Sequence, residues 1–306
     1  MPPTTTGLPS LRITLGARGR FHAGLPVLAG EAGEDLFGPA RPVGHVGRLA
    51  LFQAGDWLLG AATVPLITGL EDTTHRLYDN ILEATRGQHL ARIWNDVPAI
   101  NGSRPGGLEN YRLFCRGRSL AFEQCFGRGF NARLPAASAV GTTTARLSVV
   151  FAASPVAPRH VENPLQVAAY DYPAEFGPRP PSFARATVVP GTEGATVFIS
   201  GTAAIRGHAT VALDNPREQL ACTLENLRGI AHACGLGPDL DRDGGSRRHF
   251  KVYVRHAADQ PMVAAMLEEE LLEKTDQVSY LQAEICRAAL LVEIEASLFG
   301  VKTLDM

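Results

Sequence analysis

The sequence lacks the features that mark several classes of protein. Its five cysteines are an odd number without Cys-x-x-Cys spacing, so neither a disulfide framework nor a zinc site is predicted. No apolar run reaches the roughly 18–20 residues that a membrane span needs, and residues 3–10 do not form a signal-peptide core. The net charge of −2 provides no basic field for nucleic acid or an anionic membrane. These absences predict a cytoplasmic protein.

Signatures of cofactor binding are missing as well. The nine histidines include no His-Glu-x-x-His, and the glycines form neither a phosphate-binding loop nor a well-placed dinucleotide fingerprint. The stretch from Gly117 to Gly129 contains glycine and arginine but not at phosphate-loop spacing. We therefore expect neither a metal nor a nucleotide cofactor. A small anionic substrate is compatible with the net charge, because clefts are charged locally.

The first half of the chain reads as two strands, a helix and a strand. Residues 48–65 form a predicted hairpin around the turn at Gly55. A helix with apolar residues at i, i+4 spacing is then predicted from Asp72 to near Gly87. A strand over residues 89–94 follows.

The second half repeats this pattern. Its predicted strands and helices lie at residues 185–189, 195–200, 216–235 and 250–254, and from Pro261. With 306 residues, 45% hydrophobic, the chain is long enough for two cores. We predict an α+β fold with two similar β-sheet-plus-helix domains, residues 1–145 and 146–306. Residues 153–182 form the proline-rich connecting segment of the second domain, and residues 1–10 a loose arm.

Part of the connecting segment allows two interpretations. Five prolines between Val161 and Ser182 forbid a regular helix. Long structureless loops are usually linkers or functional. The segment is therefore either a linker on the surface or, given its aromatic residues and Arg179, the wall of a cleft.

Residues 286–296, near the C-terminus, alternate as a strand. Apolar side chains at the even positions from Leu290 to Ala296 form one face, while Glu293 and Glu295 share the other. Carboxylates on a segment apolar enough to be buried must be paired or protonated. The pattern fits either a sheet-edge strand with a wet face or a buried general acid. It does not choose between Glu293 and Glu295.

Other candidate residues have an ordinary structural explanation beside a functional one. Cys286 lacks an identifiable histidine partner, so it reads more readily as a buried apolar side chain than as a nucleophile. Two arginines converging on a pocket would hold a dicarboxylate, whereas a single arginine is usually solvated or structural. The arginines near aromatic residues are Arg112, Arg116, Arg118, Arg179 and Arg185. The backbone N–H groups of Gly201, Thr202 and Ala203 form either a carboxylate grip or a plain turn.

Several stretches of the second half resemble the RidA/YjgF family. They are Gly177–Arg185, Phe198–Gly201, Gln219–Leu227 and Val292–Glu295. In that family the first glutamate of the closing strand, here Glu293, lies in the active-site cleft. Near Tyr280 this chain lacks the arginine with which RidA proteins hold an imino-acid carboxylate. This departure disfavours an enamine or imine deaminase.

A resemblance to chorismatases covers more of the chain. Its stretches are Glu109–Phe114, Asn163–Pro164, Tyr170–Pro173, Gly177–Arg185, Gly201–Ala203, Gly207–His208 and Tyr280–Arg287. The resemblance implies cofactor-free conversion of chorismate into pyruvate and a ring product. The branch that forms aromatic hydroxybenzoates has a cysteine seven residues before the catalytic glutamate, as Cys286 precedes Glu293.

The same resemblance implies a role for each candidate. Glu293 would protonate the enolpyruvyl ether, and Cys286 would shape the pocket and exclude water. The implied substrate-binding residues are Tyr111, Arg112, Arg179, Phe183, Arg185, Gly201, Thr202, Ala203 and Tyr280. We expect a monomer that forms 3-hydroxybenzoate, with 4-hydroxybenzoate the next choice. The alternatives are a dihydroxycyclohexadiene product, a deaminase, and a non-catalytic module that binds a small carboxylate.

Overall fold

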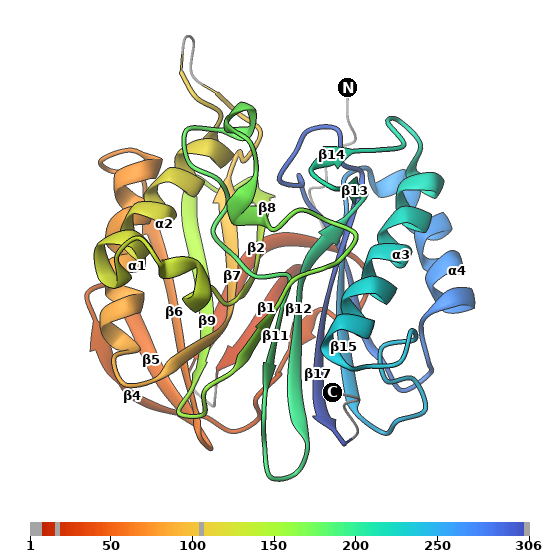
Figure 1. The fold of residues 1–306 in the computed structure, drawn as a ribbon, viewed down its shortest axis with the longest axis horizontal. Helices are drawn as coiled ribbons and strands as arrows, with labels where there is room; N and C mark the ends of the chain where they lie inside the picture. The colour runs from red at the N-terminus through yellow and green to blue at the C-terminus, as the bar shows by residue number, and fades with distance from the viewer. Residues whose placement is uncertain (1–7, 16–18, 104–106, 303–306) are drawn as a thin grey trace.

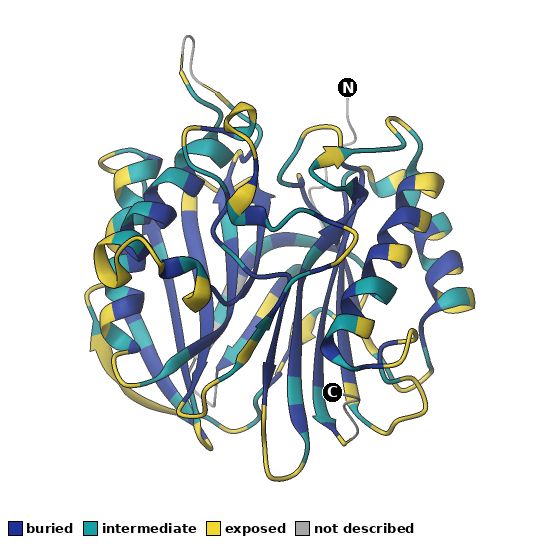
Figure 2. Cartoon of the chain, in the orientation of Figure 1, coloured by how far each residue is buried: buried dark blue, intermediate teal, exposed yellow. Residues whose placement is uncertain are grey.

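The computed structural model describes residues 8–15, 19–103 and 107–302. Two β-sheets pack face to face, and each sheet carries two helices on its outer face (Figure 1). Three of the four hydrophobic clusters in the described residues follow from these layers: one lies between the sheets and one beneath each helix pair. The strands are mostly buried, while the outer faces of the helices are exposed (Figure 2).

The first half of the chain builds a six-stranded sheet. Its strands, in spatial order, are β4 (Arg41–Val46), β5 (Leu49–Ala54), β6 (Trp57–Pro65), β9 (Arg146–Ser154), β7 (His89–Pro98) and β8 (Ala136–Thr142). Its helices are α1 (Leu70–Ala84) and α2 (Asn110–Phe126), followed by a short 3-10 turn, η1 (Phe130–Arg133). All pairs are antiparallel except β7 with β8.

The second sheet has nine strands. In spatial order they are β10 (Arg159–Val161), β11 (Ala186–Val189), β12 (Ala195–Ala203), β17 (Val292–Val301), β15 (Arg247–Val254), β16 (Gln277–Gln282), β2 (Gly19–Gly30), β1 (Ser10–Leu15) and β3 (Gly33–Glu34). The helices α3 (Pro216–Cys234) and α4 (Gln260–Glu270) cover it. A separate hairpin consists of β13 (Ile205–Arg206) and β14 (Ala209–Thr210). Three 3-10 turns complete the half, at Ala169–Asp171, Ala174–Phe176 and Ala257–Asp259.

The two sheets share one topology, which confirms the predicted α+β class with two similar halves. The order β4-β5-β6-β9-β7-β8 in one matches β10-β11-β12-β17-β15-β16 in the other. Each of these two sets of six strands contains one parallel pair, β7 with β8 and β15 with β16. The predicted strand-strand-helix-strand repeat is therefore present as a repeat of architecture.

Strand membership does not follow the predicted division at residue 145. The strand β9 begins at Arg146 and lies inside the first sheet, between β6 and β7. The strands β1–β3 join the second sheet instead, because β2 pairs with β16. Local patterns predict that a segment is a strand, but its partner depends on packing between segments far apart in the sequence. Of the predicted arm at residues 1–10, residues 1–7 lie outside the described part.

Local signals account for some helices better than others. Helix α3 has Asn215 as its N-cap, with a side chain that accepts a hydrogen bond from the Glu218 N–H, and it ends at Gly235 with φ of +84°. Helix α2 was not predicted. It packs so closely on α1 that a Cβ at Gly117 would lie 2.4 Å from the Glu71 carbonyl oxygen. Its buried face places Gly117, Arg118 and Ser119 between apolar residues, which weakens the apolar period that predicts a helix.

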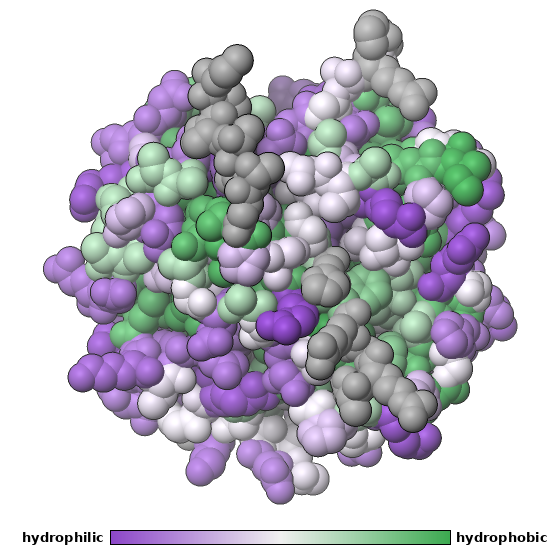
Figure 3. All heavy atoms as spheres, turned by 180° about the vertical axis from the view of Figure 1, so that it is seen from behind, coloured by the Kyte–Doolittle hydropathy of each residue, from purple (hydrophilic) through white to green (hydrophobic). Residues whose placement is uncertain are grey.

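Seen from behind, polar and charged side chains are spread among smaller apolar areas (Figure 3). Within the described ranges, every helix is too short or too polar to span a membrane.

Candidate active site

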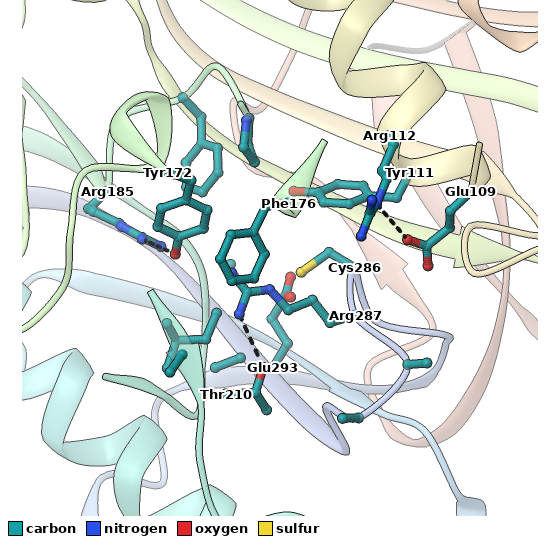
Figure 4. Close-up of a pocket in the computed structure, with 18 residues that line it drawn as sticks. Glu109, Tyr111, Arg112, Tyr172, Phe176, Arg185, Thr210, Cys286, Arg287 and Glu293 are labelled. Carbon is teal, nitrogen blue, oxygen red and sulfur yellow. Dashed lines mark hydrogen bonds and ion pairs between the residues drawn. The ribbon is translucent and has the colours of Figure 1, made fainter. Parts of the chain in front are cut away.

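A cavity of about 470 Å³ lies between the two halves (Figure 4). The first half contributes residues at and before the start of α2, and the second half contributes β12, β17, the hairpin β13–β14 and two loops. Its lining residues are Glu109, Tyr111, Arg112, Tyr172, Phe176, Pro181, Phe183, Arg185, Gly201, Ala203, Ile205, Ala209, Thr210, Cys286–Ala289 and Glu293. The lining is largely apolar with a few charged groups, which is typical of small-molecule sites.

The closing strand β17 is central in its sheet, between β12 and β15. Its apolar face packs in the core beneath the helices, and the face with Glu293 and Glu295 points toward the other sheet. Each glutamate is only 3% exposed. The interpretation as an edge strand with a wet face is therefore wrong, and the chemistry of both carboxyl groups is set by their buried neighbours.

Glu295 is the paired carboxylate. It accepts hydrogen bonds of 2.7 Å from Arg92 and from the Trp94 indole, and its oxygen lies 3.2 Å from the Lys251 ammonium. The Tyr253 hydroxyl donates a further bond of 3.1 Å. Burial alone raises its pKa, but the charges of Arg92 and Lys251 outweigh burial and lower the pKa to about 2. Glu295 is therefore ionised and structural.

Glu293 is the unpaired one. Among the described residues, no cation lies within ion-pair distance of its carboxyl group, which faces the cavity. Burial raises its pKa to about 8, and the negative charge of Glu295 adds to this effect, while Arg92 and Arg185 partly oppose it. At neutral pH the group is thus a protonated acid at a cavity wall, as a general acid requires.

The C-terminal end of β12 packs against the carboxyl group of Glu293. The register between β12 and β17 slips by one residue between Ile199 and Thr202, which marks a β-bulge. Gly201 lies in this bulge, and a Cβ there would be 2.1 Å from Oε1 of Glu293. Only glycine leaves room for the carboxyl group in this position.

Cys286 lines the cavity near Glu293, and its sulfur faces the same space (Figure 4). Burial raises the pKa of its thiol to about 12, with the nearby Glu293 contributing in the same direction. A thiol with this pKa stays protonated at neutral pH, so it is a poor nucleophile. Cys286 therefore forms an uncharged part of the cavity wall.

Two predicted arginines line the cavity. Arg185 is buried and donates hydrogen bonds to the Tyr172 hydroxyl at 2.8 Å and to the Val167 carbonyl at 3.1 Å. Arg112 is more exposed and lies 3.7 Å from the Glu109 carboxylate. Together they place two cations on the wall of a mainly apolar cavity, an arrangement suited to an anionic ligand.

Comparison with known proteins identifies the family. Residues 39–153 match the description "Chorismatase FkbO/Hyg5-like, N-terminal". A 3-hydroxybenzoate synthase of Streptomyces hygroscopicus is 36% identical over 256 residues, which cover 79% of this chain and 73% of that protein. The chain belongs to the chorismatase family. A chorismatase of Streptomyces rapamycinicus is 37% identical over 268 residues, covering 84% of this chain and 79% of the relative.

A solved chorismatase structure supports the same assignment. The matched region covers 97% of this chain and 95% of the solved chain, with a TM-score of 0.77 and 32% sequence identity. The likeness therefore extends over both halves of the chain.

Most of the site residues predicted for this chorismatase lie together at the cavity. Tyr111, Arg112, Phe183, Arg185, Gly201, Ala203, Cys286 and Glu293 all line it. Because Tyr172, Phe176 and Pro181 also line it, the connecting segment forms a cleft wall, one of its two predicted interpretations.

Three predicted residues do not line the cavity. Arg179 forms an ion pair of 2.6 Å with Glu123. The Thr202 hydroxyl donates to the Ser200 carbonyl, because alternation along β12 turns Thr202 away while Gly201 and Ala203 face the cavity. Tyr280 packs in the core beneath α3 and α4, on the helix side of its sheet.

Arg287 is the main residue that the sequence reasoning missed. Its guanidinium lies 4.2 Å from the ring centre of Phe176 and 5.2 Å from that of Tyr172 (Figure 4). It donates a hydrogen bond of 2.7 Å to the His208 carbonyl, which ties the β13–β14 hairpin to the aromatic wall. The available signal was its position next to Cys286, within the stretch that resembles chorismatases.

Proposed function

We propose that this chorismatase converts chorismate into pyruvate and 3-hydroxybenzoate. The observation that carries the proposal is Glu293, a buried carboxyl group with a pKa of about 8 at the wall of the cavity. Chorismate carries an enolpyruvyl ether. When the acid protonates the methylene carbon, the electron pair of the double bond forms the new C–H bond and a cation stabilised by the ether oxygen results. The bond between that oxygen and the ring then breaks, and pyruvate is released.

Binding of the substrate is supported by the cations of the wall. Chorismate has two carboxylates, and Arg185, Arg112 and Arg287 face the cavity. Arg185 is held by Tyr172 and Val167, so its guanidinium is fixed before the ligand arrives. Preorganised cations orient the ether relative to the acid, and such positioning supplies much of the rate in reactions of this type.

The aromatic product is supported by Cys286. Pyruvate and hydroxybenzoate together contain all the atoms of chorismate, so the reaction consumes no water. After pyruvate leaves, the ring carbon that carried the ether is cationic and its neighbour carries the hydroxyl group, so direct loss of the proton from that neighbour would give 4-hydroxybenzoate. For 3-hydroxybenzoate, the hydroxyl oxygen bonds to the cationic carbon to form an epoxide while its proton passes to the ionised Glu293. Glu293 then returns the proton to the epoxide oxygen, the bond from that oxygen to its original carbon breaks, and Glu293 accepts the ring proton from the carbon that now carries the oxygen, which makes the ring aromatic. The neutral thiol of Cys286 occupies space beside the acid where water would otherwise lie. We place 4-hydroxybenzoate second and the non-aromatic diene, the product of hydrolysis, third. A monomer in the cytoplasm remains our prediction.

The experiment is to incubate the purified protein with chorismate and without added metal. Pyruvate is followed by a coupled assay and the ring product is identified by chromatography. Glu293→Gln is compared with Glu123→Gln, a control carboxylate that pairs with Arg179 outside the cavity. We expect 3-hydroxybenzoate and pyruvate in equal amounts from the wild type and the control, and neither from Glu293→Gln.

Each other result has a definite meaning. A non-aromatic diene keeps the reaction class but removes the role given to Cys286. Full activity in Glu293→Gln refutes the assignment of the acid. No pyruvate from folded wild-type protein refutes the proposed function and favours a module that only binds a small carboxylate.

A further inference from the structure

One buried cation in the described part of the chain has no carboxylate partner. The buried arginine and lysine side chains are Arg92, Arg118, Arg185, Arg248 and Lys251. Four of them have a carboxylate oxygen within 4.0 Å, from Glu295, Glu162, Asp276 and Glu34. Arg118, on α2, is 1% exposed and has none among the described residues. A buried charge without a counterion is costly, so this exception calls for an explanation.

The neighbours of Arg118 hold it in place without neutralising it. Its guanidinium lies 5.0 Å from the ring centre of Phe114 and 5.9 Å from that of Phe183. Burial raises the pKa of Cys115 to about 11 and that of Tyr111 well above its ordinary value, so both groups are neutral. The Nε atom is buried and has no hydrogen-bond partner in the described part. The guanidinium thus keeps an unused donor and an unbalanced charge.

Arg118 lines a recess of about 30 Å³ that adjoins the main cavity. The recess is bordered by Tyr111, Arg118, Ala137, Ser138, Ala139, Phe183, Gly201, Cys286 and Glu293. Five of these residues also line the main cavity, namely Tyr111, Phe183, Gly201, Cys286 and Glu293. The recess therefore lies directly behind the side chains that surround the acid. It has room for a small group attached to a ligand, but not for a ring.

We propose that Arg118 is a substrate-binding residue whose guanidinium pairs with the carboxylate of the enolpyruvyl side chain in this recess. The inference rests on the proposed function and names which substrate group this arginine takes. A substrate carboxylate supplies the counterion that the protein itself does not provide. When this carboxylate binds, it neutralises the buried guanidinium and accepts a charged hydrogen bond from it, and both effects favour binding of an anion.

The choice between the two carboxylates of chorismate follows from Glu293. In the side chain, the methylene carbon and the carboxylate are attached to the same carbon atom. Glu293 borders both the recess and the cavity. A side-chain carboxylate in the recess therefore brings the methylene carbon to the acid that must protonate it. The ring then occupies the larger cavity, where Arg185, Arg112 and Arg287 are available to its carboxylate.

The test compares Arg118→Met with Arg179→Met, a control arginine whose partner Glu123 lies outside the cavity. We expect Arg118→Met to lower kcat/KM for chorismate roughly 10- to 100-fold, mainly through KM, because a charged hydrogen bond to the substrate is lost. The control keeps wild-type kinetics. Inhibition by added 3-hydroxybenzoate is expected to be the same in all three proteins, since the ring carboxylate binds elsewhere.

Thermal unfolding separates binding from a structural role. Removing an unpaired buried charge does not weaken a fold, so Arg118→Met is expected to unfold at or above the wild-type temperature. If this variant does not fold, Arg118→Lys, which keeps the charge with a different shape, is expected to fold and to raise KM as well.

The outcomes that overturn the inference are distinct. Wild-type KM in folded Arg118→Met refutes it and leaves the proposed function standing. Loss of 3-hydroxybenzoate inhibition in that variant places the ring carboxylate in the recess instead and also refutes it. Release of no pyruvate by the wild type overturns the proposed function and this inference together.

Discussion

Replacing Glu295 by glutamine is the sharpest test of how this chorismatase keeps its acid protonated. Glu295 lies two residues from Glu293 on the same face of β17, and its charge raises the pKa of Glu293. Arg92 and Arg185 act in the opposite direction, while Tyr253 and Cys286 are neutral neighbours. In Glu295→Gln the negative charge disappears and Arg92 is no longer neutralised. Both changes lower the pKa of Glu293.

The size of the effect follows from strand geometry. With a rise of about 3.3 Å per residue, the two carboxylates are roughly 7 Å apart. At an effective dielectric constant of about 20, their repulsion at this distance is about 2 kcal/mol, which lowers the pKa of Glu293 by about 1.5. From a wild-type value of about 8, the protonated fraction at pH 7 then decreases about fourfold. The activity at pH 7 decreases by the same factor.

The assay is a pH profile of kcat/KM for chorismate. Activity depends on the protonated acid, so it decreases as the pH rises through the pKa of Glu293. We expect the decrease near pH 8 in the wild type and about 1.5 pH units lower in Glu295→Gln, with nearly equal activities at pH 5.5. Removing one partner of a buried ion pair costs about 3 kcal/mol of stability, so folding is checked by circular dichroism at each pH. An unchanged profile in folded Glu295→Gln refutes the reasoning.

Three further predictions concern the cavity wall. Because the folded-state pKa of Glu293 is raised, its contribution to stability is present at low pH and is lost as the pH rises toward 8. The melting temperature of the wild type is therefore expected to decrease over this pH range, and the decrease is expected to be smaller in Glu293→Gln. An equal decrease in both proteins contradicts the raised pKa. Gly201→Ala displaces the acid and is expected to lower kcat about 100-fold with the fold retained, and wild-type kcat contradicts the close contact. Cys286→Ala is expected to keep pyruvate release but to increase the diene fraction, measured by chromatography; an unchanged product ratio removes the role of the thiol.

The parts of the fold that could be predicted from the sequence are those with local causes. Asn215, Pro216 and Gly235 set the ends of α3 through their own backbone preferences. Alternation placed Glu293 and Glu295 on one strand face. It could not tell which was paired, because Arg92 and Lys251 lie on other strands, β7 and β15, and meet Glu295 only when the sheets pack.

The misplaced residues have similar explanations. Tyr280 belongs to a stretch that resembles the family, but its strand turns the ring toward the helices. Arg179 is predicted at the cavity because of its aromatic surroundings, but its partner Glu123 lies on α2, a helix that the sequence analysis does not predict. Arg118 lies on the same helix. Arg118 is a buried charge without a carboxylate partner among the described residues. A local sequence pattern cannot predict this, because it depends on which side chains lie nearby in three dimensions.

The pairing of β2 with β16 has a consequence for how the protein is made. These strands join residues 19–30 to residues 277–282, so they are separated by most of the chain. During synthesis β2 leaves the ribosome about 250 residues before its partner β16 does. Sheet pairing between such distant segments is slow, and an unpaired strand edge is prone to aggregation. We therefore expect the nine-stranded sheet to fold completely only after residues 277–282 have left the ribosome, so that the edge of β2 stays unpaired until then.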